Sequence, residues 1–220
     1  MNLFDSNSLI MKLFNLLADI LLLHILWLVY SLPIITIGAS TTALYYAMMK
    51  RIRTDEGNII PNFHGSFKSN FRQATIIWII LATFFIVFFL DIRFCLALNN
   101  DFSKIMLFGC SLFFLPFLLI CFYIFPVQAK FENRIFDNFK NAFFMAFVHF
   151  PYTLLLIFLT ATVILFAFRY RLLMGFFIIC GMGFYSYITS GVYIQVFRKY
   201  IPNEAEEDLE KSGRTFYFNQ

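Results

Sequence analysis

Long apolar runs separated by short polar stretches dominate the pattern of this chain. Each run is a candidate membrane-spanning helix, because about 20 consecutive apolar residues cross the hydrocarbon core of a bilayer. The clearest runs cover residues 20–30, 74–90, 105–125, 152–168 and 172–196. We therefore predict an all-α fold, a polytopic membrane helical bundle with 5–6 spanning segments within residues 1–200, followed by a short polar tail over 201–220.

A sixth segment depends on a break that follows the first run. The stretch SLPIITIGASTTALYYAMMKR (31–51) contains a proline and a glycine, and its first cation is Lys50. Pro33 removes a backbone donor and Gly38 adds a flexible point, so the pattern predicts a helix that stops and then resumes. Residues 33–49 then turn back across the membrane, re-enter it, or continue the first helix as one bent helix.

Small residues surround this break. Gly38 with Thr42, and Ala39 with Ala43, are four positions apart, which lets a neighbouring helix approach closely. Irregular backbone at membrane depth is tolerated only where protein or water satisfies it, so we expect the break to be buried against other helices. We interpret it as a packing kink in preference to a substrate site. The predicted helix-break and packing motif comprises Pro33, Thr36, Gly38, Ala39, Thr42 and Ala43.

Amphipathic stretches lie between the apolar runs. The polar loop predicted over 54–73 overlaps NFHGSFKSNFRQA, in which aromatic residues recur every four positions beside cations, as in helices that lie in the membrane interface. A second such stretch covers 128–149, after a run that contains Pro116 and is predicted to end at Pro126. The residues predicted to contact a partner or lipid are Phe63, Phe67, Lys68, Phe71, Arg72, Lys130, Phe136 and Lys140.

Two of these stretches resemble each other. FKSNFRQA (67–74) and FDNFKNAF (136–143) each precede an apolar run. This similarity, here called the echo, indicates either a duplicated unit of one interfacial and one membrane helix, or two unrelated segments that meet the same physical requirement.

Composition supports residence in a membrane. Of the 220 residues, 60% are hydrophobic and 14% are charged, and the mean hydropathy is +0.75. A soluble domain averages about 45–50% apolar and about 25% charged residues, so lipid must solvate most of this surface. The N-terminus has no basic region before its first run, and we expect that run to be retained instead of cleaved as a signal peptide.

Cations predict the orientation. They gather in segments 50–72 and 126–151 and in the tail, while the other loops hold few. Short loops rich in Lys and Arg stay cytoplasmic, so we expect a multi-pass protein of the bacterial cell membrane with a cytoplasmic C-terminus. The side of the N-terminus stays open.

Motifs for chemistry are missing from the sequence. It contains no nucleophile elbow, HExxH or phosphate-binding lysine loop, and its four cysteines are scattered singly. We predict no enzyme activity, no catalytic residues, no cofactor, no metal and no nucleic-acid binding. His24 is the one ionisable group well inside an apolar run, and is a possible intramembrane polar site. It either bonds a neighbouring helix or serves as a proton relay or ligand site.

Several stretches resemble a known family. LPIITIGASTTALYY, FKSNFRQATIIW, YIFP (123–126) and FDNFKNAFFMAF are similar, in order, to sequences of the YesL-like bacterial membrane proteins, a family of unknown molecular function. Family members usually carry Asn at the position of His24. The family occurs in Gram-positive bacteria beside carbohydrate ABC importers, so the resemblance implies an accessory role in oligosaccharide uptake.

Three hypotheses follow. The first is a non-catalytic accessory subunit that contacts the permease subunits of a carbohydrate ABC importer and membrane lipids. The second is a stand-alone small transporter or channel with the broken helix along its path. The third is a membrane sensor or assembly factor that signals through its tail. The sequence does not predict the oligomeric state.

Overall fold

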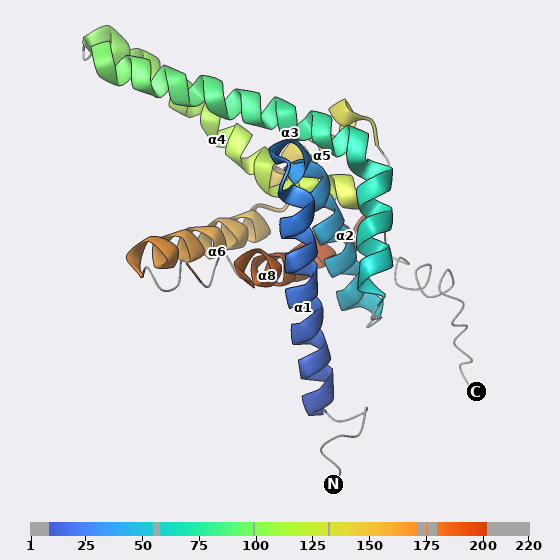
Figure 1. The fold of residues 1–220 in the computed structure, drawn as a ribbon. Coiled ribbons are helices and arrows are strands. Elements are labelled where there is room, and N and C mark those ends of the chain that lie inside the picture. The colour runs from blue at the N-terminus through green and yellow to red at the C-terminus, as the bar shows by residue number, and fades with distance from the viewer. Residues whose placement is uncertain are drawn as a thin grey trace.

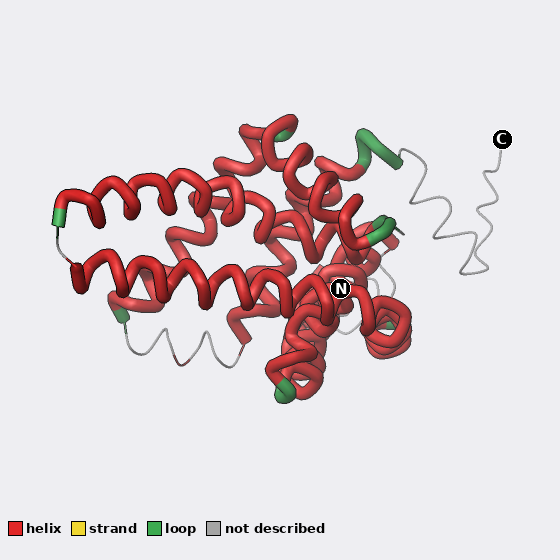
Figure 2. Tube along the Cα trace, turned by 90° about the horizontal axis from the view of Figure 1, so that it is seen from above, coloured by secondary structure: helices red, strands yellow, loops and turns green. Residues whose placement is uncertain are grey.

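The computed structural model describes residues 9–54, 58–98, 100–131, 133–170, 175 and 180–201. The described part is built from helices joined by short loops (Figure 2). In chain order they are α1 (Leu9–Ser31), the short 3-10 helix η1 (Ile34–Thr36), α2 (Ile37–Thr54), α3 (Ile59–Leu98), α4 (Asp101–Lys130), α5 (Ile135–Val148), α6 (Phe150–Arg169) and α8 (Met182–Phe197). The predicted all-α fold is confirmed for these residues.

The first two helices form an antiparallel hairpin (Figure 1). Near the turn, Trp27 Nε1 donates to Thr41 Oγ1 at 3.1 Å. At the opposite end, Arg51 Nε donates to Asp19 Oδ2 at 2.5 Å, and both side chains are largely buried. The chain therefore turns back after the break, and the interpretation of one bent helix is wrong.

The third helix is longer than the sequence indicated. The polar loop predicted over 54–73 is helical from Ile59 onward, and α3 continues into the apolar run as one helix of 40 residues. At 1.5 Å per residue this helix is about 60 Å long, about twice the thickness of bilayer hydrocarbon, so part of it must lie outside that layer. Figure 1 shows it bending, with its first part beside α2 and the rest running outward beside α4.

The outer parts of α3 and α4 form a long hairpin, here called the arm (residues 79–98 and 101–120). Aromatic rings join its two helices: Phe88 stacks on Phe114 with ring centroids 3.9 Å apart. At the tip, the Asn100 side chain accepts a hydrogen bond from the Ser103 backbone N–H at 2.8 Å, which caps α4. The arm is therefore held by ring stacking and a capped turn.

The fourth helix does not end where the sequence predicted. It passes through Pro116 and Pro126 and ends at Lys130. Because Pro126 has no N–H, the carbonyl of Phe122 loses its donor within the helix. The Tyr193 hydroxyl of α8 donates to that carbonyl at 2.6 Å. A neighbouring helix thus supplies the missing bond and lets α4 continue.

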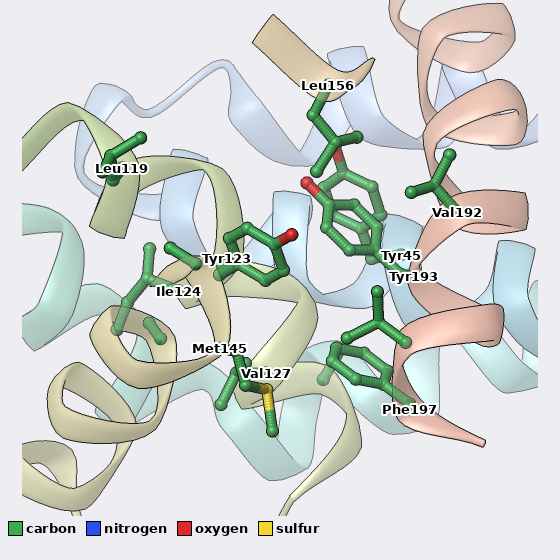
Figure 3. Packing of buried hydrophobic residues seen from close by; sticks show 14 of the residues in the cluster. Tyr45, Leu119, Tyr123, Ile124, Val127, Met145, Leu156, Val192, Tyr193 and Phe197 are labelled. Carbon is green, nitrogen blue, oxygen red and sulfur yellow. The ribbon is translucent and has the colours of Figure 1, made fainter. Parts of the chain in front are cut away.

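Buried apolar side chains gather in two clusters. One joins α2, α4 and α8 through Tyr45, Tyr123, Tyr193 and Phe197, which Figure 3 shows packed around a common centre, and it also includes Met145 of α5. The other joins α1, α2 and α3 and includes Leu23, Leu44, Met48 and Phe63. Together the clusters place α2 at the middle of the molecule.

Four helices of the described part are long and apolar enough to cross a membrane: α1, α3, α4 and α6. Their outer faces carry large exposed apolar side chains, such as Phe113 and Phe168, each 81% exposed. The chain is consistent with a multi-pass membrane protein, while the predicted count of 5–6 spans is not confirmed. The run predicted over 172–196 lies partly outside the described residues.

Candidate functional site

The predicted helix-break motif is enclosed from Thr36 onward. A Cβ added to Gly38 would lie 2.5 Å from the Ala74 carbonyl oxygen and 2.6 Å from Trp78 Cβ, so only glycine allows α3 to pass this close. Trp78 Nε1 donates at 2.8 Å to the carbonyl of Ile34 in η1. The break is thus closed by α3 through direct backbone contact and an indole hydrogen bond.

Short polar side chains satisfy the backbone around the break. Thr36 Oγ1 donates to the carbonyl of Tyr30 at 2.6 Å, and Thr42 Oγ1 donates to that of Gly38 at 2.9 Å. Ala39 and Ala43 are fully buried.

The apex of the turn is exposed, although we expected the whole helix break to be buried against other helices. Pro33 is exposed, as are Leu32 at 79% and Ile34 at 73%. The prediction that the whole break is buried is therefore wrong for residues 32–35, because the turn projects beyond the helices that cover Gly38.

His24 lies between α1 and α8 and is 1% exposed. Its Nδ1 accepts a hydrogen bond from the Gly183 backbone N–H at 3.2 Å, and its ring stacks on Trp27 with centroids 6.0 Å apart. A Cβ on Gly183 would lie 2.7 Å from the Ile20 carbonyl oxygen. His24 therefore joins the first and last described helices where their backbones almost touch, which favours the packing interpretation over a relay.

A cluster of amide side chains, here called the amide cluster, lies where α3, α4 and α5 meet. Gln128 is 3% exposed, and its Nε2 donates to Asn70 Oδ1 at 2.8 Å and to Gln73 Oε1 at 2.9 Å. Its Oε1 accepts from Nδ2 of Asn138, which is fully buried. Gln73 Nε2 also donates to the Asn133 carbonyl at 2.6 Å. One glutamine therefore holds three helices together.

Sequence reasoning missed the amide cluster, although the echo between the two stretches contained its signal. The segments NFRQA (70–74) and NFKNA (138–142) each place an asparagine against Gln128 and end in a fully buried alanine. Each also carries an exposed cation, Arg72 or Lys140, two residues after the asparagine. The two stretches thus perform the same packing task, each bonding its asparagine to Gln128 of α4.

The predicted partner and lipid contacts divide into buried and exposed side chains. Phe63 is fully buried, with its ring 5.3 Å from that of Tyr30, so it belongs to the core and is removed from the predicted contact surface. Phe67 packs on the same tyrosine at 4.7 Å. The exposed members are Lys68, Phe71, Arg72, Phe136 and Lys140, and Lys130 is half-buried.

Tyrosine hydroxyls provide the other polar groups of the interior. Tyr123 Oη lies 2.9 Å from Thr153 Oγ1, and Tyr185 Oη lies 2.9 Å from Thr160 Oγ1. Both pairs link a tyrosine to α6. These hydroxyls are engaged in joining helices.

His149 lies at the junction of α5 and α6 and is 4% exposed. Its Nε2 lies 3.1 Å from the hydroxyl of Tyr200, just beyond the end of α8. Burial, and secondarily the positive charge of Lys199, lower the pKa of His149 below its ordinary value. The neutral ring is thus the form that joins the end of α8 to this junction.

Ligands for a metal do not gather in the part of the chain that the structure describes, where no group of three or more His, Cys, Asp or Glu side chains meets. The cysteines at 95, 110, 121 and 180 form no disulfide bond with one another.

Comparison with known proteins gives one finding. No curated protein and no solved structure matches the chain significantly. Residues 20–92 match the model of a family described as a protein of unknown function, DUF624. The matched segment covers about a third of the chain and includes the helix break, Gly38, and the first member of the echo.

Proposed function

We propose that this protein is a non-catalytic integral membrane accessory subunit of a carbohydrate ABC importer. The observation that supports the accessory role is that polar groups and large apolar groups face different surroundings. Buried amides such as that of Gln128 and buried hydroxyls such as that of Tyr123 bond to side chains of neighbouring helices, whereas the arm and α6 present broad apolar faces to their surroundings. Such a molecule offers surfaces for association and few polar groups for chemistry or passage.

The apolar faces suit contact with lipid and with the spans of another membrane protein. On the arm, Phe113 is 81% exposed and Ile105 is 73% exposed. A neighbouring span that packs on these side chains would gain dispersion contacts without any polar group to desolvate. This supports an interface with permease subunits at bilayer depth.

A second surface is the cationic face on the first part of α3 and on α5. Lys68, Arg72 and Lys140 point outward, opposite to the side chains that each helix buries. Cations in such positions attract acidic protein surfaces or anionic headgroups. We propose that this face lies on the cytoplasmic side and contacts the importer there.

The carbohydrate part of the proposal comes from resemblance alone. YesL-like proteins belong to DUF624, the family whose model matches residues 20–92. The resemblance implies neighbourhood with carbohydrate importers in Gram-positive bacteria, and we extend that role to this chain.

Affinity purification from native membranes tests the proposal. The tagged protein is solubilised in mild detergent, and its companions are identified by mass spectrometry. We expect permease subunits of a carbohydrate importer, recovered several-fold less with the double variant K68E/R72E. The matched control K12E/R198E reverses two exposed cations, on α1 and at the end of α8, that lie outside both proposed surfaces, and it should retain the companions.

Two outcomes count against the proposal. The first is recovery of the protein alone, with no importer subunit above the background of an untagged strain. The second is uptake of a sugar by liposomes that contain only this protein, which would make it a transporter in its own right.

A further inference from the structure

A cavity of about 240 Å³ lies between α2, α4 and α8. It sits next to the Phe122 carbonyl, which Pro126 leaves without a helical donor. Its lining residues are Thr41, Tyr45, Leu118, Cys121, Phe122, Phe125, Pro126, Met182, Tyr185 and Tyr193. None of these described residues carries a charge.

The hydroxyls in this lining already have partners within the protein. Thr41 accepts from Trp27, and Tyr193 donates to the Phe122 carbonyl. Tyr45 Oη lies 3.4 Å from Thr189 Oγ1, and the hydroxyl of Tyr185 bonds to α6. The lining holds no charged group and its hydroxyls already make bonds within the protein, so few polar partners remain for a sugar or an ion, whose other polar groups would be left unpaired at a free-energy cost. The cavity therefore favours apolar over polar ligands.

The remaining surface of the cavity suits hydrocarbon. Phenyl and phenol ring faces, Leu118 and Met182 are apolar, and a methionine side chain adapts its shape to what it contacts. An empty apolar space leaves its lining atoms without dispersion partners on one side. A flexible apolar chain that enters the space restores those contacts and needs no hydrogen bond.

The position of the cavity brings it next to such chains. α4 is one of the helices able to cross the membrane, and Leu118 at the edge of the cavity is 37% exposed. One turn away on the same helix, Phe113 and Leu115 are largely exposed and face the surroundings of the arm. In a bilayer these surroundings are acyl chains, present at a far higher local concentration than any dissolved ligand.

We propose that the cavity between α2, α4 and α8 is a binding site for one acyl chain of a bilayer phospholipid. The chain enters past Leu118 and lies against the rings of Tyr45 and Tyr185. Its occupancy adds apolar contacts among α2, α4 and α8, whose residues line the cavity. This site does not depend on the identity of any protein partner.

Photo-crosslinking tests the site with the full-length protein in liposomes. The probe is a phosphatidylcholine analogue that carries a diazirine midway along one acyl chain, at a few per cent of total lipid. After irradiation, the labelled residues are found by mass spectrometry. We expect labelling at Met182 and Tyr185, which line the cavity, in addition to the outward faces of the arm.

A matched pair of variants separates the cavity from general lipid contact. Cys121→Phe fills the cavity, whereas Cys110→Phe adds the same volume to the arm, where the side chain is not part of the lining. We expect labelling of Met182 and Tyr185 to fall at least five-fold in C121F and to be unchanged in C110F. Leu118→Trp, a substitution at the partly exposed edge, provides a second block should C121F fail to fold.

Two results overturn the proposal. One is labelling confined to outward residues such as Phe113, with none at Met182 or Tyr185 in the unaltered protein. The other is labelling of the cavity residues that persists at full strength in a folded C121F or L118W variant. Size-exclusion chromatography in detergent establishes that each variant is folded before the comparison is made.

Discussion

Two regions of the molecule differ in which residues they bury and which they expose: the hairpin of α1 and α2, and the arm of α3 and α4. α2 is rich in small and polar residues, and most of it is buried, including Ser40, Thr42 and Gly38. The arm is richer in apolar residues and mostly exposed, with Phe113 at 81%. In water the more polar helix would lie outside.

This inversion shows what holds the molecule together. Lipid solvates the large apolar side chains of the arm as well as a protein core would, so burying them yields little. Close backbone approach at Gly38 and internal hydrogen bonds, such as those of Gln128, are the contacts that lipid cannot replace. Substitutions at the close contacts and internal hydrogen bonds should therefore destabilise the protein more than substitutions on the arm.

The largest effect is expected for Gln128→Ala. The substitution leaves the buried amide of Asn138 and the acceptor oxygens of Asn70 and Gln73 without their shared partner. Each buried polar group left unpaired costs about 1–3 kcal/mol, so we expect a loss of about 3 kcal/mol in the free energy of unfolding. Denaturation in detergent, followed by circular dichroism, measures this loss. The exposed Gln195→Ala should change it by less than about 0.5 kcal/mol.

A similar test compares two glycines. Gly38→Ala places a Cβ against the Ala74 carbonyl oxygen at 2.5 Å and should destabilise the protein by about 1–3 kcal/mol. Gly109→Ala, on the arm, meets nothing within 4 Å and should be neutral or slightly stabilising. Thermal unfolding in one detergent compares both variants with the parent. Equal melting temperatures for the two would contradict the close contact between α2 and α3.

Tyr193→Phe is expected to have an intermediate effect. It removes the hydroxyl that donates to the carbonyl exposed by Pro126, and should cost about 1–2 kcal/mol. Restoring the backbone donor with Pro126→Ala in the same chain should recover part of this loss, because the carbonyl then regains a bond within its helix. A double-mutant cycle measured by chemical denaturation gives the coupling, and strictly additive losses would argue against this interpretation.

The smallest effects are expected on the arm and at His149. Phe113→Ala exposes no buried cavity and should change the free energy of unfolding by less than about 0.5 kcal/mol in lipid.

At His149 the folded pKa lies below the ordinary value of 6.5. Well above pH 6.5 the ring is neutral in both folded and unfolded chains, so the free energy of unfolding does not depend on its protonation there. As the pH falls below this value the unfolded chain takes up the proton first, and the folded state loses stability until its own lower pKa is passed. Melting temperatures between pH 7.5 and 5 should therefore decline less steeply for His149→Gln than for the parent. Parallel curves would show that the histidine is not the responsible group.

The sequence predicted the features that depend on local pattern. Periodicity and residue size were enough to predict the helical runs, the break at Pro33 and the small residues that allow close approach at Gly38. The structure confirms a helix that stops and resumes.

Features that depend on distant partners were missed. From the sequence alone, Pro126 indicates the end of a helix. The Tyr193 hydroxyl, which donates to the Phe122 carbonyl in place of the missing N–H, lies 71 residues away from Phe122 along the chain. Gln128 reads as an ordinary polar residue because its partners come from α3 and α5. The start of α3 is predicted as a separate interfacial helix within a polar loop, because its polar residues hide the fact that the helix continues into the apolar run. Each error concerns a polar group whose partner only the fold reveals.

The contact between His24 and Gly183 has a consequence for biosynthesis. The two residues are 159 positions apart, so the first helix enters the membrane long before its partner has been translated. Until then the imidazole of His24 and the surface of α1 beside Ile20, which Gly183 contacts in the folded protein, face lipid or a chaperone. Closure of the bundle therefore waits for α8 to emerge, and a ribosome stalled before residue 183 should leave an open, protease-sensitive chain.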